Sequence, residues 1–299
     1  MKLKQDAFSS CHPIINFYYF AVAILCAMFF LHPILSPVSL IIAVIYSIYL
    51  NGKKAVKFNL LGMLPVMFFA TIANPLFNHA GITMLFYLEN GNPVTLEAIV
   101  YGVASGCMLV TVIIWFSCYN AVMTSDKFIY LFGKIIPVLS LIFSMVLRFV
   151  PKFKMQIKVI SNAQRCIGRD VSQGNIFSRI KNGLAILSIF ITWVLENAIE
   201  TADSMKSRGY GLKKRTAFSN FRFTQRDVIL LCILSVCLIF IVAGIVLNIT
   251  NMKFFPMIII NEITPISIMV YFAYLILLGV PIVIGVLEDI KWKYIQSGN

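Results

Sequence analysis

The stretch DVILLCILSVCLIFIVAGIVLNI, residues 227–249, decides the fold class of this chain. It carries one charged residue, at its first position, and it exceeds the roughly 20 apolar residues that a helix needs to cross a bilayer. The whole chain has the same character, because 60% of its 299 residues are hydrophobic and only 12% are charged. Its mean hydropathy is +0.88, and soluble domains contain about 25% charged residues. The sequence therefore predicts an all-α polytopic membrane protein.

Five further stretches are predicted to cross the membrane, which gives about six transmembrane helices in all. They cover residues 14–32, 35–50, 60–78, 95–121 and 264–287. In the stretch 95–121, Gly102 and Gly106 form a small-xxx-small pattern. This pattern favours close packing against another helix.

The basic residues indicate the orientation of the spans. Cytoplasmic segments of membrane proteins are rich in lysine and arginine. If both termini lie in the cytoplasm, only Lys253 of the 25 lysines and arginines lies outside. The net charge of +13 is then explained by topology and by attraction to anionic lipid, not by nucleic acid. We therefore expect a multi-pass protein in contact with the bilayer, with cytoplasmic termini and no nucleic-acid partner.

The charge pattern divides the chain into three parts. We expect N-terminal transmembrane helices in 1–121, a cytoplasmic region in 122–226 and C-terminal transmembrane helices in 227–299. The central region contains two apolar runs, 135–147 and 184–195, which are short for a span. They are predicted to form interfacial or half-buried helices. Spanning hairpins are the alternative.

Each apolar run leads into an amphipathic helix that ends at a glycine, a common C-terminal stop. The first helix covers about 151–168, with Pro151 suited to its first position, and the second covers about 193–209. At 100° per residue, the first carries a basic stripe and the second an acidic stripe. The basic stripe consists of Lys154, Lys158, Arg165 and Arg169, and the acidic stripe of Glu196, Glu200, Asp203 and Ser207. The helices thus form a weak internal repeat of opposite charge.

No motif indicates that the chain catalyses a reaction by itself. The sequence has no phosphate-binding loop, no GxSxG and no HExxH. Its three histidines are scattered, and Glu196, Glu200 and Asp203 have no second acidic cluster to face. The acidic stripe is therefore interpreted as a solvated or salt-bridged helix face. We expect no metal, no cofactor and no enzymatic activity.

Arg208 is the residue that most suggests a binding role. It lies in Ser207-Arg208-Gly209-Tyr210-Gly211, at the end of the second amphipathic helix. A guanidinium group presents five donors in a fixed fork, which suits an acidic groove on a partner protein. The alternative is a cytosolic anchoring arginine.

Four stretches together resemble a known family. They are HPIINFYYF (12–20), RFVPKF (148–153), AQRCIG (163–168) and ETADSMKSRGYG (200–211). Their order and spacing resemble the T component of energy-coupling factor (ECF) transporters, the EcfT/CbiQ-like family. The resemblance covers most of the chain and is most specific over 148–211.

The resemblance implies a function in uptake across a bacterial or archaeal plasma membrane. In this family the T component is a scaffold that joins a membrane-embedded, substrate-binding S component to two ABC-type ATPases, for a vitamin or a transition-metal ion. Two crossed cytoplasmic coupling helices each end in a motif that enters a groove of one ATPase. Two rival functions are a conventional ABC permease lining the translocation path and a membrane-embedded lipid-modifying enzyme. The sequence does not name the transported substrate.

The resemblance also implies roles for individual residues. Ser207, Arg208 and Gly209 match the second ATPase-docking motif. The first motif departs from the family, because Ile167 stands where the family has its second arginine. Arg165, Gly168 and Arg169 surround that position, and the choice between Arg165 and Arg169 stays open. In a crossed pair, Lys154 and Lys158 are expected to oppose the acidic stripe, formed by Glu196, Glu200 and Asp203.

Overall fold

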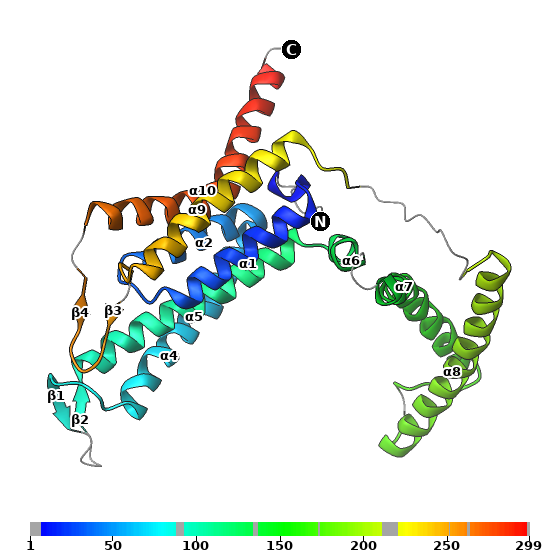
Figure 1. The fold of residues 1–299 in the computed structure, drawn as a ribbon. Helices are drawn as coiled ribbons and strands as arrows, with labels where there is room; N and C mark the ends of the chain where they lie inside the picture. The colour runs from blue at the N-terminus through cyan, green and yellow to red at the C-terminus, as the bar shows by residue number, and fades with distance from the viewer. Residues whose placement is uncertain are drawn as a thin grey trace. The chain divides into compact units, whose positions relative to one another are not determined.

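The computed structural model describes residues 7–87, 93–133, 137–172, 174–210, 221–250, 252–261 and 264–297. It divides into two compact units, which are described separately (Figure 1). The bundle unit comprises Met1–Phe128 and Phe221–Asn299, and the hairpin unit comprises Ile129–Asn220. The hairpin unit is therefore an insertion between two parts of the bundle unit.

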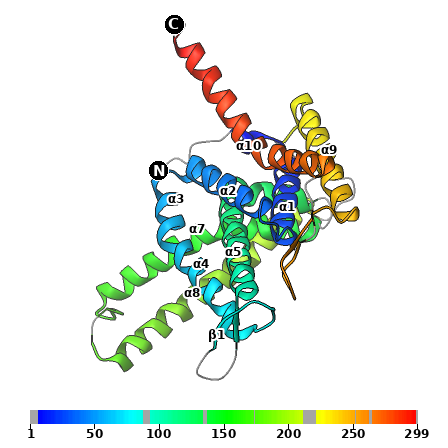
Figure 2. The ribbon, with the colours of Figure 1, turned by 90° about the vertical axis from the view of Figure 1, so that its left-hand side faces the viewer.

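Six long helices build the bundle unit. They are α1 (Pro13–Phe29), α2 (Leu35–Asn51), α4 (Leu64–Phe77), α5 (Leu96–Val122), α9 (Gln225–Val246) and α10 (Pro265–Ser297). Helix α5 packs against α1, α2 and α4, while α10 packs against α2 and α9. The last turns of α10 project from the bundle (Figure 1 and Figure 2).

Short elements connect these helices. The 3-10 helix η1 (Phe8–Ser10) precedes α1, and α3 (Lys53–Lys57) and the π-helix η2 (Phe58–Met63) lead into α4. Two antiparallel hairpins, β1 (Met84–Tyr87) with β2 (Pro93–Thr95) and β3 (Met252–Lys253) with β4 (Ile259–Ile260), join helices of the bundle. Helix α6 (Ser125–Gly133) begins in the bundle unit and ends in the hairpin unit.

An aromatic cluster forms the core of the bundle unit. Trp115 and Tyr19 are fully buried, and their ring centroids lie 5.9 Å apart in an edge-to-face arrangement. Their polar atoms are satisfied, because Tyr19 Oη donates to the Leu278 carbonyl at 2.9 Å and Trp115 Nε1 donates to Ser39 Oγ at 3.3 Å. Aromatic side chains packed in this way stabilise the bundle through van der Waals and edge-to-face contacts. Their hydrogen bonds fix how α1 lies against α10 and how α5 lies against α2.

The small-residue pattern of α5 lies against α4, as the sequence predicts. A Cβ atom added at Gly102 would lie 2.6 Å from the Thr71 carbonyl oxygen, and one added at Gly106 would lie 3.1 Å from that of Met67. At Gly102 only glycine permits this approach between the two backbones, whereas a Cβ atom at Gly106 would require a small shift of α4.

The described helices confirm the all-α membrane class. Five are long and apolar enough to cross a membrane: Lys53–Phe77, Leu96–Val122, Ile176–Ser207, Gln225–Val246 and Pro265–Gln296. Helices α1 and α2 are apolar but shorter. Four of the five, together with α1 and α2, correspond to predicted spans, whereas Ile176–Ser207 belongs to the hairpin unit.

The hairpin unit consists mainly of two long helices, α7 (Pro137–Cys166) and α8 (Ile176–Ser207). Helix α7 includes 137–147 of the first apolar run, whose residues 135 and 136 lie outside the described residues, and α8 includes the second run, 184–195. Each helix continues without a break into the amphipathic part that follows. Pro151 accordingly lies inside α7 and not at its first position. The helix continues through it because an internal proline removes one backbone hydrogen bond and kinks a helix without necessarily ending it.

Candidate docking site on the helical hairpin

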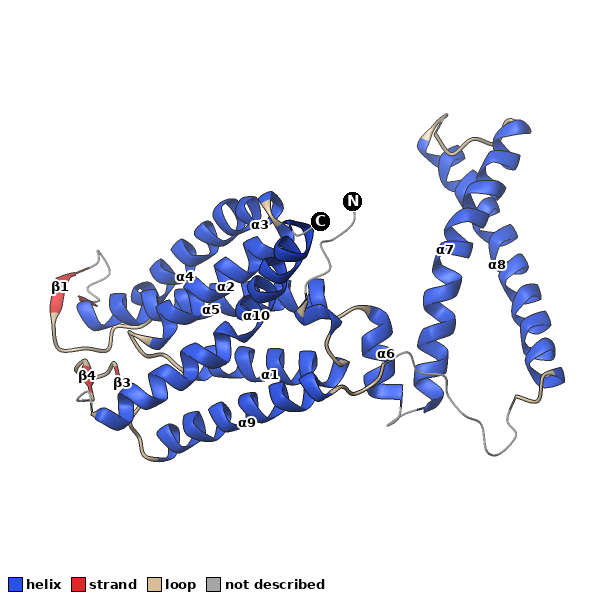
Figure 3. Ribbon diagram, turned by 90° about the horizontal axis from the view of Figure 1, so that it is seen from above, coloured by secondary structure: helices blue, strands red, loops and turns tan. Residues whose placement is uncertain are grey.

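Helices α7 and α8 run antiparallel and cross at an aromatic contact (Figure 3). The Phe153 ring centroid lies 5.6 Å from that of Phe190 and 6.2 Å from that of Trp193, both edge-to-face. Beside it, Lys152 Nζ donates to Asn197 Oδ1 at 3.0 Å and lies 5.1 Å from the Trp193 ring centroid. The stretch RFVPKF therefore provides the crossing point, through edge-to-face aromatic packing and a cation–π contact.

Between the crossing, the start of α7 and the end of α8, the two helices diverge and enclose a cleft of about 750 Å³. Leu141, Met145, Arg148, Phe149 and Lys152 line it from α7. Asn197, Glu200, Thr201, Ser204, Met205, Arg208 and Tyr210 line it from α8 and the residues after it. Three of these side chains are cationic and one is anionic, so the cleft favours negatively charged groups.

Both helices end in the same backbone motif. Gly168, with φ +79°, follows α7, where the Arg169 N–H donates to the Gln164 carbonyl at 3.0 Å. Gly209, with φ +75°, follows α8, where the Tyr210 N–H donates to the Met205 carbonyl at 3.0 Å. These are Schellman motifs, in which the positive φ favours glycine.

The shared motif aligns the two ends residue by residue. With Gly168 placed on Gly209, Arg208 corresponds to Ile167 and Lys206 to Arg165. The weak internal repeat thus has a structural counterpart. At the end of α7, the residue that corresponds to Arg208 is therefore uncharged. The end of α7 is called the first end below, and the end of α8 the second.

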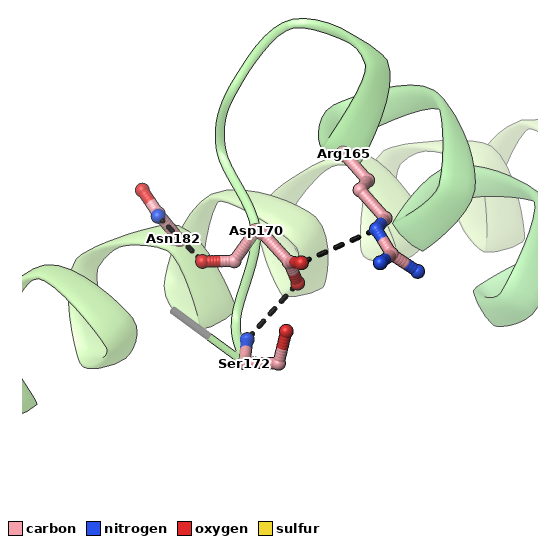
Figure 4. A network of polar contacts seen from close by, with 4 residues as sticks. All are labelled: Arg165, Asp170, Ser172 and Asn182. Carbon is pink, nitrogen blue, oxygen red and sulfur yellow. Dashed lines mark hydrogen bonds and ion pairs between the residues drawn. The ribbon is translucent and has the colours of Figure 1, made fainter. Parts of the chain in front are cut away.

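A polar network shapes the first end (Figure 4). Arg165 Nε lies 3.3 Å from Asp170 Oδ2, the Ser172 N–H donates to Asp170 Oδ1 at 3.0 Å, and Asn182 Nδ2 donates to the Asp170 carbonyl at 3.1 Å. Hydrogen bonds from Ser172, together with the Arg165 guanidinium, hold the pKa of the Asp170 carboxyl below its usual value. Sequence reasoning missed Asp170 and Asn182, because their contact depends on how the turn between α7 and α8 folds.

The cations at the two ends differ in their surroundings. Arg165 is held by the ion pair with Asp170. For Arg169 and Arg208, the described part of the chain shows neither an ion pair nor a side-chain hydrogen bond, and both side chains are exposed. Ser207 Oγ bonds only locally, to the Ser204 carbonyl at 2.9 Å. The unpaired guanidinium groups are therefore open to a partner.

The predicted pairing of the stripes has no direct counterpart among the described contacts. The five charged residues Lys154, Lys158, Glu196, Glu200 and Asp203 are all exposed, and within the described ranges no ion pair joins the two stripes. The polar contact at the crossing is made instead by Lys152 and Asn197. Glu200 lines the cleft on the side opposite Arg148 and Lys152. Pairing between the stripes stays a prediction.

A sequence profile described as "CbiQ: Cobalt transport protein" matches residues 10–219, more than half of the chain. The chain belongs to the CbiQ family. The match includes both ends of the hairpin and the N-terminal HPIINFYYF stretch. It confirms the resemblance to ECF transporter T components, and with it the assignment to a membrane transport family.

Individual relatives of this CbiQ-family chain align with part of it. The energy-coupling factor transporter transmembrane protein EcfT of Staphylococcus aureus is 36% identical over 92 residues, which are 30% of this chain and 34% of the relative. That of Lacticaseibacillus paracasei is 38% identical over 90 residues, again 30% and 34%. EcfT 1 of Listeria monocytogenes is 33% identical over 110 residues, 36% of this chain and 40% of the relative. The chain thus aligns with roughly a third of the length of these relatives.

Metal-binding side chains are not grouped in this CbiQ-family chain. Among the described residues, no three or more histidines, cysteines, aspartates or glutamates lie where they could hold one metal ion together. The features that stand out are the two helix ends and the cationic cleft, which suit protein contact.

Proposed function

We propose that this chain is the energy-coupling scaffold of an ECF-type ABC importer. It joins a membrane-embedded S component, which binds the solute, to two ABC-type ATPases. The transported solute is a vitamin or a transition-metal ion, and ATP hydrolysis is carried out by the partners. The chain itself is not an enzyme.

The observation that carries this proposal is the pair of equivalent helix ends. Each is an exposed Schellman motif with a nearby arginine, and each belongs to one arm of an antiparallel hairpin. Two ATPases need two docking points, which such a hairpin supplies. The second docking point consists of Ser207, Arg208 and Gly209. Gly209 has no side chain, so an ATPase can approach the backbone closely there, and the Arg208 guanidinium is unpaired within the described residues.

The first docking point consists of Gly168 with Arg169 as its main cation. Arg165 is already engaged by Asp170 at 3.3 Å, and its transfer to a partner would leave the buried Asp170 Oδ2 without this contact, which opposes the transfer. Arg169 has no such contact in the described part of the chain. Arg165 instead shapes the turn and contributes to docking more weakly.

The hairpin unit and both termini face the cytoplasm in this proposal. The support is the distribution of basic residues, which leaves only Lys253 outside. A conventional ABC permease is the weaker alternative, because the family match and the two equivalent helix ends both favour a T component. A lipid-modifying enzyme would need convergent polar groups, and the exposed acidic stripe is the main candidate for them.

Purification of the tagged chain from native membranes, with mass spectrometry of the bound subunits, tests the proposal. We expect two ATPase subunits per chain and a small hydrophobic membrane protein. The purified chain alone should neither hydrolyse ATP nor bind solute. Saturable solute binding by the chain alone, measured by calorimetry, would contradict the scaffold function.

A further inference from the structure

The N-terminal segment Phe8–Asn16 contacts bundle-unit residues that lie close in sequence to both connections with the hairpin unit. The hairpin unit starts after Phe128 and ends before Phe221. Lys127 directly precedes the first connection, and Asp227 follows closely after the second. All of the contacts described below lie within the bundle unit.

Lys127 makes the contact at the first connection. Its side chain is 8% exposed, and Nζ donates to the Ser9 carbonyl and to the Val122 carbonyl at 3.0 Å. In the amide orientation that satisfies both of its polar atoms, Asn16 also accepts from Lys127 Nζ at 3.1 Å and donates to the Phe8 carbonyl at 3.0 Å. A buried ammonium group is tolerated only when it is hydrogen-bonded. Lys127 therefore joins the end of α5 to the N-terminal segment.

Asp227 makes the contact at the second connection. Its side chain is 2% exposed, and Oδ1 accepts from the His12 N–H at 3.2 Å. Its other oxygen, Oδ2, accepts from the Thr224 N–H at 2.9 Å and from Thr224 Oγ1 at 2.7 Å. The Asp227 carboxylate thus caps the N-terminus of α9 and also accepts a hydrogen bond from the N-terminal segment. Nearby, Arg226 Nη2 donates to Ser10 Oγ at 3.1 Å.

The segment that receives these contacts is itself fixed in the core. Phe8 is fully buried, and its ring centroid lies 5.1 Å from that of Tyr19. His12 Nδ1 accepts from the Ile14 N–H at 3.3 Å, at the start of α1. The N-terminal segment is therefore packed into the bundle unit. It contacts Lys127, before the first connection to the hairpin unit, and Asp227, after the second.

We propose that Phe8–Asn16 acts as a clamp within the bundle unit, which holds the two points of that unit from which the hairpin unit extends, with Lys127 and Asp227 as its positioning residues. The proposal rests on the proposed function. When the ATPases move the hairpin, the clamp transmits that movement to the membrane helices. Loosening the clamp should leave the partners bound and ATP hydrolysis running, while transport no longer follows hydrolysis.

The test uses the whole importer, purified and reconstituted in liposomes. Lys127→Met and Asp227→Leu each remove one side of the clamp, because methionine cannot donate to the Ser9 carbonyl and leucine cannot accept from the His12 N–H. Lys291→Met and Asp126→Leu are matched controls, because both side chains are exposed in the bundle unit. We measure subunit stoichiometry, ATP hydrolysis and solute uptake per ATP.

Both clamp variants should keep all subunits and hydrolyse ATP, yet lower uptake per ATP by on the order of 10-fold, a typical size for a coupling effect. The controls should match the wild type.

Normal uptake per ATP in both clamp variants would overturn the proposal. If Lys127→Met fails to insert into the membrane, Asp227→Leu decides the result alone, because leucine has nearly the shape of aspartate but no hydrogen-bond acceptor. Hydrogen exchange on the full chain without partners separates the clamp from the proposed function. Both variants should exchange faster than wild type over residues 8–16, whether or not ATPases ever bind. Unchanged exchange there would count against the clamp even if the chain proves to be a T component.

Discussion

Arg165 lies in the last turn of α7 and Arg169 follows Gly168 beyond the end of the helix, and their guanidinium groups have different surroundings. Asp170 holds Arg165 through an ion pair, whereas the described residues show no such contact for Arg169. The difference decides which side chain is available to a partner without breaking an existing contact.

We predict that Arg169→Glu weakens ATPase binding more than Arg165→Glu does. Loss of a buried, hydrogen-bonded charge contact costs about 2–5 kcal/mol, whereas an exposed ion pair contributes about 0–1 kcal/mol. Affinity of the detergent-solubilised chain for the ATPases measures the difference. Lys181→Glu, an exposed charge reversal on α8, is the control. A larger loss for Arg165→Glu would assign the first groove to Arg165.

At the residue scale, the sequence predicted the helix ends better than the crossing. Gly168 and Gly209 each come directly after a stretch with helical periodicity, and a glycine in that position is typical of a left-handed C-terminal cap. The contact between Lys152 and Asn197 was missed because the point at which two helices cross depends on their packing angle, which periodicity does not specify. The ion pair of Arg165 was missed because it depends on the folded turn.

At the scale of elements, Phe153 of α7 packs against Phe190 and Trp193 of α8 where the two helices cross. We predict that Phe153→Ala destabilises this contact by about 1–3 kcal/mol, below the 3–5 kcal/mol typical of a fully buried Phe→Ala change, because Phe153 is half-buried. Hydrogen exchange over residues 186–197 should become faster. Phe143→Ala is the control, since its side chain is 52% exposed. Equal exchange in the two variants would show that Phe153 does not hold the crossing.

The contact between α4 and α5 gives a second prediction at this scale. Gly102→Ala places a Cβ atom 2.6 Å from the Thr71 carbonyl oxygen, and overpacking of this kind costs about 1–3 kcal/mol. Thermal unfolding in detergent should show a lower midpoint. In the matched control Gly279→Ala, the new Cβ meets no atom within 4 Å, so its midpoint should stay or rise. A Gly102→Ala midpoint equal to that of the control would contradict the close packing.

The extent of each element was less predictable than its existence. The sequence predicted helices in the apolar runs 135–147 and 184–195, followed by amphipathic helices over about 151–168 and 193–209. In the structure α7 begins at Pro137 and α8 at Ile176, and each helix continues without a break from its apolar part into its amphipathic part. The change from apolar to polar composition marks a change of surroundings along one helix and not a boundary between two elements.

At the scale of the whole molecule, the basic residues predict one orientation in the membrane. Single cysteines introduced at Leu85 and Arg222 into a cysteine-free variant test it with an impermeant thiol reagent. We expect labelling of Leu85→Cys in intact cells, and of Arg222→Cys only after lysis. The reverse pattern would invert the topology and place the hairpin unit outside.

The fold class, the family and the principal spans were all predictable from the sequence, because hydropathy and short motifs carry them. The shared role of the segment 8–16 was not. It depends on contacts between residues more than a hundred positions apart, such as His12 with Asp227. Such contacts leave no periodic pattern in a single sequence.

The most direct test of the central claim is the count of ATPase subunits bound by Arg208→Glu, measured together with solute uptake. Lys206→Glu is the matched control, because it reverses an exposed charge two residues away. A loss of about 2–5 kcal/mol corresponds to about 30-fold to several thousand-fold in affinity. We predict that Arg208→Glu inserts normally and keeps its S component but loses an ATPase and uptake, while Lys206→Glu keeps both. Two bound ATPases with normal uptake in Arg208→Glu would contradict the account.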